Sequence, residues 1–138
     1  MLVTTITKNI IKTENIPDTE GDNGAELHFI GKVRSWENEK AITALEYEYY
    51  PGMAEKELQK LGEEVLDTFP IQSLKCIHRV GVIPVGEASL LVVIESPHRK
   101  EALEAMAYFI STLKKDVPIW KYAHFIDGSR EVSECSHG

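Results

Sequence analysis

The sequence predicts an α+β fold with a mostly antiparallel sheet and two main helices, and three observations support this prediction. Several short segments are rich in β-branched residues or alternate apolar with polar residues, as half-buried strands do. Two longer segments carry apolar residues at helical spacing, with charged residues opposite them. Strand segments also follow one another directly, which is typical of α+β proteins. The 138 residues fit one domain, so residues 1–138 are expected to form a single unit.

The N-terminal part of the chain predicts strands separated by loops. Residues 2–11 are rich in β-branched side chains, and residues 14–24 contain enough Pro, Gly, Asp and Asn to predict a mobile loop. Residues 25–34 and 42–50 each alternate apolar and polar positions, so both are expected to be half-buried strands. The polar and charged residues 35–40 between them suit a hairpin loop.

A first helix is predicted over residues 53–69. Pro51-Gly52 precedes it and Pro70 follows it. Its apolar positions share one face and are Ala54, Leu58, Leu61, Val65 and Phe69. Two further strands are then predicted over residues 73–83 and 88–95. The second of these strands is apolar on both faces, so it is expected to lie centrally in the sheet.

A second helix is predicted from Pro97 or His98 to about Lys115. Its wide apolar face implies deep burial and consists of Leu103, Met106, Ile110 and Leu113, widened by Ala102, Ala105 and Phe109. A strand over residues 119–126 and a short extended piece after a turn are expected to complete the fold. Residues 133–138 are expected to form a flexible tail.

The charge balance and the cysteine usage exclude several classes of protein. The chain has 22 Asp and Glu against 15 Lys and Arg, a formal net charge of -7, which argues against a sequence-independent nucleic-acid binder. No run of 18 apolar residues occurs, so no membrane span is predicted. Cys76 and Cys135 lack metal-binding spacing, and His78 and His124 fit sheet-surface or interface positions, so no metal site is expected. No signal peptide is recognised, and a cytoplasmic location is expected.

Positive charge is concentrated at two places against this acidic background. One cluster contains His98 and Arg99, and the other contains Lys114 and Lys121. Such clusters favour a pocket for an anion. His98 and Arg99 are expected at the start of the second helix, where free backbone N–H groups favour phosphate. Lys114 is expected at its other end, about 20 Å away at 1.5 Å per residue. One shared site therefore requires assembly across a dimer, or a turn that brings Lys121 to the start of the helix.

Each of these residues also has a purely structural interpretation. Lys114 could simply close the helix, where the helix dipole favours cations, and His98 could be a surface residue of the first turn. Arg34 could end a strand in solvent, and Phe29 could belong to the core. The residues taken alone leave these alternatives open.

Six fragments, in their order and spacing, resemble one family of proteins. They are Gly31-Lys32-Val33-Arg34, residues 46–53 ending in Tyr-Pro-Gly-Met, Ile77-His78-Arg79-Val80-Gly81, Pro84-Val85-Gly86-Glu87, Ser96-Pro97-His98-Arg99, and residues 113–121 with their Pro-Ile-Trp-Lys ending. From about residue 24 to residue 132, the chain resembles the large, catalytic subunit of molybdopterin synthase.

The resemblance implies a fold, an activity and partners. The implied fold is the α/β-hammerhead, and the implied assembly is a homodimer in which each protomer binds a small ubiquitin-like subunit, giving a heterotetramer. The small subunit would carry a thiocarboxylate on its C-terminal Gly-Gly and thread that tail into the pocket. The implied reaction converts cyclic pyranopterin monophosphate into molybdopterin by two sulfur transfers from successive carriers. No metal or organic cofactor is implied for this step.

The resemblance also implies roles for individual residues. Lys114 would be the main catalytic group beside the terminal carbonyl of the carrier, and Lys121 would support it. The substrate phosphate and pterin would be held by Arg34, His98 and Arg99, and Phe29 would form part of the wall. These residue types suit two anionic reactants, because Arg offers a planar bidentate fork and Lys offers a compact charge that can move a proton.

The chain also departs from the pattern of the family. Many members carry a lysine and a glutamate where this chain has Tyr122 and Ala123. Arg130 is a candidate to replace a basic residue that members carry near their C-terminus. An alternative reading therefore remains, in which the chain is a non-catalytic relative that binds the tail of a ubiquitin-like partner as a regulatory module. The intact set of cations favours the enzyme.

Overall fold

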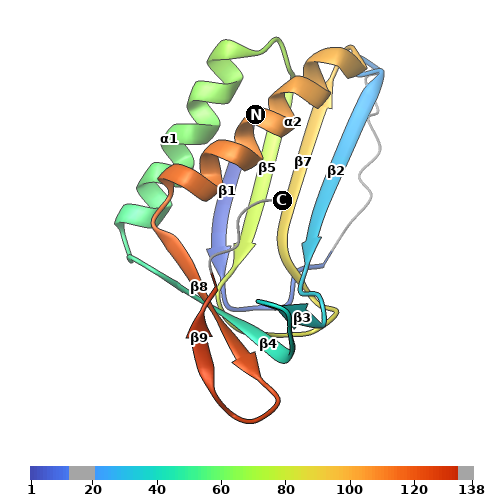
Figure 1. Cartoon of the computed structure of the whole chain (residues 1–138). Coiled ribbons are helices and arrows are strands. Elements are labelled where there is room, and N and C mark those ends of the chain that lie inside the picture. Colours follow the sequence, from blue (N-terminus) through green and yellow to red (C-terminus); the bar gives the residue numbers. More distant parts are fainter. Residues whose placement is uncertain (13–20, 134–138) are drawn as a thin grey trace.

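The computed structural model describes residues 1–12 and 21–133 and confirms the α+β class (Figure 1). Most of the predicted loop at 14–24, nearly all of the predicted tail at 133–138, and Cys135 lie outside the described residues. The elements are β1 (Leu2–Thr7), β2 (Ala25–Lys32), β3 (Trp36–Glu37), β4 (Lys40–Tyr49), α1 (Met53–Thr68), β5 (Ser73–Arg79), β6 (Gly81–Pro84), β7 (Ala88–Ser96), α2 (Arg99–Asp116), β8 (Ile119–Phe125) and β9 (Arg130–Val132).

The first of two sheets has the strand order β1-β5-β7-β2. Strand β7 lies in the interior of this sheet, as its continuous apolar run predicts, and Leu91, Val92 and Ile94 are buried. Its pairs with β5 and β2 are antiparallel, whereas β1 pairs with β5 in parallel. The sheet is therefore mixed, with one parallel pair at its edge.

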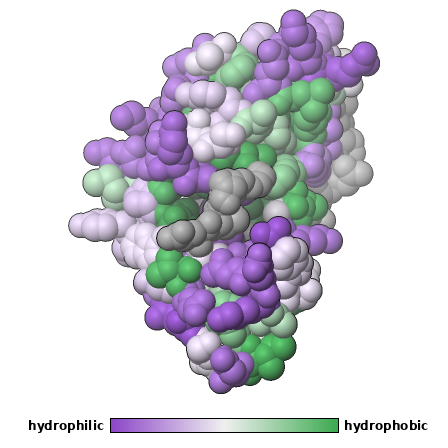
Figure 2. Space-filling model, in the orientation of Figure 1, coloured by the Kyte–Doolittle hydropathy of each residue, from purple (hydrophilic) through white to green (hydrophobic). Residues whose placement is uncertain are grey.

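Helices α1 and α2 cover one face of this sheet (Figure 1). The main core lies between them and the sheet, and the apolar stripe predicted for the first helix is buried there from Ala54 to Val65. The stripe predicted for the second helix holds except at Leu103, which is 56% exposed. The buried face of α2 is centred on Ala102, Met106 and Phe109, and Leu103 lies outside it because one residue rotates the helix by about 100°. The helix faces turned to the viewer in Figure 2 are largely hydrophilic.

The second sheet has the strand order β3-β4-β8-β9, with β6 also paired to β4. It has a smaller core of its own, built from Val33, Ile42, Leu45, Ile83, Ala123 and Phe125. None of the helices in the described part of the chain is long and apolar enough to cross a membrane.

The prediction of one strand over residues 73–83 is wrong. The strand ends at Arg79, and Gly81 has a φ of 90°, a conformation that glycine adopts without the strain a side chain would bring. The chain changes direction there, so that β5 pairs in the first sheet and β6 pairs with β4 in the second. This break carries the chain from one sheet to the other.

Residues 35–40 form a hairpin, but it joins the short strand β3 to β4 and not the two long strands on either side. Trp36 and Glu37 form the short strand β3, which pairs with Ala41 and Lys40 at the start of β4. Residues 38 and 39 both have positive φ, as in the tight turns that favour two-residue hairpins. The flanking strands β2 and β4 do not pair with each other, because they belong to different sheets. Val33, the residue after β2, packs in the core of the second sheet, so the end of β2 lies beside that sheet.

Candidate active site

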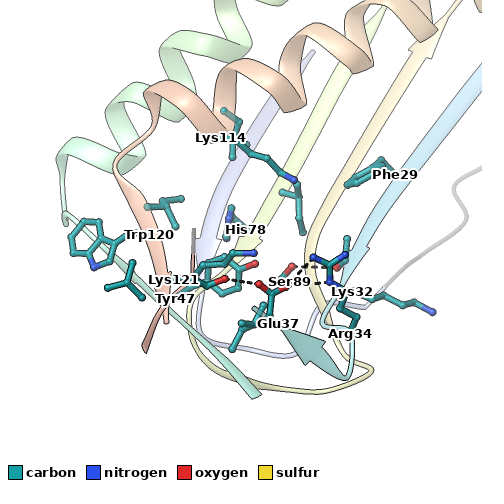
Figure 3. Close-up of a pocket in the computed structure, with 17 residues that line it drawn as sticks. Phe29, Lys32, Arg34, Glu37, Tyr47, His78, Ser89, Lys114, Trp120 and Lys121 are labelled. Carbon is teal, nitrogen blue, oxygen red and sulfur yellow. Dashed lines mark hydrogen bonds and ion pairs between the residues drawn. The ribbon is translucent and has the colours of Figure 1, made fainter. Parts of the chain in front are cut away.

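A cavity of about 440 Å³ lies where the two sheets meet the C-terminal end of α2 (Figure 3). The end of β2 and the loop after it contribute Phe29 and Arg34, α2 contributes Lys114, and β8 contributes Lys121. The other lining residues are Gly31, Lys32, Glu37, Leu45, Tyr47, His78, Ser89, Leu90, Leu113, Ile119, Trp120, Val132 and Ser133. The break in the strand after Arg79 and the turn after α2 bring these distant segments together.

Positive charge predominates around this cavity. Four cations, Lys32, Arg34, Lys114 and Lys121, line it against one carboxylate, that of Glu37, in a chain of net charge -7. In Figure 3 the side chain of Lys32 extends away from the other three cations, whereas Arg34, Lys114 and Lys121 lie around the centre of the set of lining residues. Positive charge on low-dielectric walls attracts anions, so the cavity fits anionic reactants.

Four of the six site residues predicted from the sequence line this cavity together, and two do not. His98 is the N-cap of α2 and Arg99 is its first residue, and both are exposed. Arg99 is fifteen residues from Lys114, which corresponds to about 22 Å along the helix axis. Within one chain, α2 separates these two residues from Phe29, Arg34, Lys114 and Lys121, as its length led us to expect.

Glu37 is a cavity residue that sequence analysis missed. Its side chain is only 4% exposed, and it accepts hydrogen bonds from Ser133 Oγ at 2.5 Å and Arg34 Nε at 3.2 Å. Burial raises the pKa of Glu37, but the hydrogen bonds from Ser133 and Arg34 and the charges of Lys121 and Arg34 outweigh it. The pKa therefore lies below its usual 4.5, and the carboxylate is ionised at neutral pH.

His78 was expected at a sheet-surface or interface position, but within this chain it is only 4% exposed and lines the cavity. Its Nδ1 lies 2.8 Å from the Arg79 carbonyl oxygen. A carbonyl can only accept a hydrogen bond, so Nδ1 carries the proton and Nε2 is the acceptor. Burial, with a smaller contribution from the charge of Lys114, lowers the pKa of His78 to about 4, although the hydrogen bond to the Arg79 carbonyl opposes this shift. The ring is therefore neutral at pH 7, and it adds an acceptor to a cationic wall.

The two residues that differ from the family pattern, Tyr122 and Ala123, do not line the cavity. Ala123 is fully buried in the core of the second sheet. Tyr122 lies on the opposite face of β8, where the guanidinium of Arg130 stacks 3.7 Å from its ring centroid. Arg130 also pairs with Glu46 and Glu48, so within one chain it is held on that outer face.

The pattern of the sequence and the fold agree with one family of known proteins. The family model described as MoaE protein matches residues 6–116 of the chain. The chain belongs to the MoaE family. The molybdopterin synthase catalytic subunit of Bacillus subtilis is 41% identical over 131 residues, which cover 94% of this chain and 83% of that protein. The same subunit of Dictyostelium discoideum is 43% identical over 113 residues, which cover 80% and 72%.

Solved structures of MoaE-like proteins share the fold. The crystal structure of molybdopterin synthase from Staphylococcus aureus superposes with a TM-score of 0.82 at 34% identity and covers 96% of both chains. A complex of subunits 1 and 2 of the molybdopterin-converting factor from Helicobacter pylori superposes with a TM-score of 0.71 at 27% identity, covering 99% of this chain and 92% of that one.

Proposed function

We propose that this member of the MoaE family is the catalytic subunit of a molybdopterin synthase, a sulfurtransferase of molybdenum cofactor biosynthesis. The observation that carries the proposal is the convergence of Arg34, Lys114 and Lys121 on one cavity. Both reactants of the synthase are anions that repel each other, and only a cationic site allows them to approach closely. The names of the relatives point to the same activity.

The substrate of the proposed reaction is cyclic pyranopterin monophosphate. Arg34 fits its phosphate, because a guanidinium donates two parallel hydrogen bonds to phosphate oxygens. Phe29 is half-buried against the main core and provides an apolar wall for the flat pterin ring. The neutral Nε2 of His78 offers a hydrogen-bond acceptor for an N–H group of a ligand.

The proposed chemistry is a sulfur transfer from the C-terminal thiocarboxylate of a small ubiquitin-like carrier. The thiocarboxylate sulfur attacks a carbon of the substrate, so that a C–S bond forms while a C–O bond at that carbon breaks. The oxygen leaves with the electron pair and takes up a proton, and the sulfur now joins the substrate to the carrier as a thioester. Water then attacks the carbonyl carbon of the carrier, which breaks the thioester and releases the carrier as a carboxylate. Lys114 suits the carbonyl oxygen on which negative charge develops in this step, and Lys121 supports it. A second carrier delivers the second sulfur of the dithiolene.

The carrier and a second copy of the chain are the proposed partners. A two-subunit complex is known for the related converting factor of Helicobacter pylori. We propose the same pairing here, in a heterotetramer built on a homodimer. In that assembly His98 and Arg99 would reach the cavity of the neighbouring protomer, since α2 is too long for them to reach their own.

The proposal is tested by reconstitution. The purified chain is mixed with a thiocarboxylated small subunit and the pyranopterin precursor, and the dithiolene product is measured. Product is expected with the thiocarboxylated carrier and absent with the same carrier ending in an ordinary carboxylate. Binding of the carrier without product would support the non-catalytic binding module instead.

A further inference from the structure

We propose that Glu37 is a positioning residue that holds the guanidinium of Arg34 in the orientation needed to bind the substrate phosphate. The inference rests on the proposed function for the identity of the ligand. Its structural part, that Glu37 fixes Arg34, stands on contacts within the described residues.

Glu37 divides its two oxygens between two segments of the cavity wall. Oε1 accepts from Arg34 Nε at 3.2 Å and lies 3.1 Å from Arg34 Nη2, while Oε2 accepts from Ser133 Oγ at 2.5 Å. Ser133 is itself fixed, because its backbone N–H donates to the Lys121 carbonyl oxygen at 3.0 Å. The carboxylate therefore has both oxygens occupied and cannot rotate without losing a hydrogen bond.

These contacts determine which part of Arg34 faces a ligand. Nε and Nη2 share one edge of the guanidinium, and this edge is turned to Glu37 (Figure 3). A guanidinium has five N–H donors in a rigid plane, so the end carrying Nη1 and the second hydrogen of Nη2 is left for another partner. That end has the fork geometry that binds phosphate in a bidentate manner.

Arg34 depends on Glu37 for this orientation. Its side chain is 60% exposed, and Glu37 is its only ion-pair partner in the described part of the chain. The guanidinium also lies over the ring of Trp36, whose centroid is 5.5 Å from Arg34 Cζ. An exposed arginine without a fixed partner samples many rotamers and must lose that freedom when it binds a ligand. Glu37 removes most of this cost before the substrate arrives.

The burial of Glu37 fits this role. An ionised carboxylate is costly to bury unless it is paired and hydrogen-bonded, and Glu37 meets both conditions only because Arg34 and Ser133 come together around it. It also places one negative charge between Arg34 and Lys121, which reduces the repulsion between two cations that must act in one cavity.

The test is the Glu37→Gln variant of the full chain in the reconstituted reaction. Glutamine keeps the size of the side chain but removes the charge and turns one oxygen acceptor into an NH2 donor. We expect the KM for the precursor to rise about fivefold, with kcat changed less than about twofold, because the variant loses preorganised ground-state binding. An unchanged KM would overturn the proposal. The matched control is Glu48→Gln, which makes the same change in an Arg–Glu pair outside the cavity and is expected to leave both constants unchanged.

A double-mutant cycle distinguishes positioning from a general structural effect. In an Arg34→Ala background, Glu37→Gln is expected to change the KM by less than about twofold, because Glu37 acts through Arg34. An equal rise in both backgrounds would show that Glu37 acts by another route and would contradict the proposal. If Glu37→Gln does not fold, Glu37→Asp replaces it, and a rise in KM of about threefold is expected because the charge is withdrawn by one methylene.

A measurement that does not depend on catalysis tests the positioning role of Glu37 independently of the proposed function. The side-chain Nε–H of Arg34 is observed by 15N NMR and assigned by its loss in Arg34→Lys. Its exchange with solvent is expected to be at least about fivefold faster in Glu37→Gln than in the parent protein, because the hydrogen bond that protects it is lost. Equal exchange rates would refute the positioning role, whether or not the parent protein produces the dithiolene. A parent protein with no activity but a protected Nε–H would refute only the proposed function.

Discussion

Individual side chains in the cavity owe their state to what surrounds them. His78 and Glu37 are both nearly buried, yet burial keeps the imidazole neutral while hydrogen bonds and nearby cations keep the carboxylate ionised. The cavity thus contains a fixed acceptor, a fixed anion and several cations at the same pH. Each of these states gives a measurable consequence.

The lowered pKa of His78 predicts a loss of stability in mild acid. The folded pKa of about 4 lies below the ordinary 6.5, so the neutral ring stabilises the fold fully above pH 6.5. This contribution is lost as the pH falls from 6.5 towards 4. Between pH 7 and 4.5, the free energy of unfolding is expected to fall by about 2 kcal/mol more in the parent protein than in His78→Gln. Urea unfolding at both pH values measures this difference, and equal losses would show that the ring is not held neutral.

Sequence reasoning located the cations of the cavity better than the residues between them. Lys114, Lys121, Arg34 and Phe29 were selected from the resemblance, and they line one cavity. Glu37 was not selected, because its partner Ser133 lies 96 residues away and no local pattern reveals that contact. The position of His78 could have been inferred, since Leu74 and Cys76 occupy the buried face of the same strand at alternating positions.

Among the elements, the strand break after Arg79 has the largest effect on the site. Gly81 allows β5 to end in the first sheet and β6 to begin in the second. The regular apolar pattern across residues 73–83 conceals this break, because both strands have buried positions. Pairing of strands between distant segments is likewise not encoded in local periodicity, so the division into two sheets was not predicted.

Gly81→Ala is expected to destabilise the fold through its backbone alone. The φ of 90° is strained for a residue with a Cβ, whereas no heavy atom lies within 4 Å of the added methyl group. A loss of about 1–2 kcal/mol in the free energy of unfolding is expected. Gly81→Asn is the matched comparison, since asparagine tolerates positive φ better, and its loss is expected to be smaller. An Asn variant as unstable as the Ala variant would contradict this explanation.

The two positions of β8 that depart from the family pattern are predicted to differ in how much a substitution destabilises the fold. Ala123 is fully buried in the second core, so Ala123→Glu would bury an unpaired charge and is expected to cost about 3 kcal/mol or more. Tyr122 is partly exposed, and Tyr122→Lys loses only its contact with Arg130, at a cost of about 1 kcal/mol or less. Thermal unfolding of the two single variants tests this, and a stable Ala123→Glu protein would show that the strand can turn this position outward.

At the scale of the whole molecule, the fold places positively charged residues in two separate regions. An acidic chain with a net charge of -7 gathers cations around one cavity and places two further cations, Arg99 and Lys100, at the far end of α2. The long helix makes these two regions distinct within one chain. In the proposed homodimer, the start of α2 from one copy would lie beside the cavity of the other copy.

The most direct measurement is turnover in the reconstituted reaction by Lys114→Ala, compared with Lys115→Ala. Both lysines are in the last turn of α2 and exposed, but only Lys114 lines the cavity. Lys114→Ala is expected to lower kcat at least about 100-fold while carrier binding and melting temperature are retained, because a charge that stabilises the transition state is lost. Lys115→Ala is expected to remain within about twofold of the parent protein. Near-normal turnover by Lys114→Ala, or an equal loss in both variants, would contradict the account.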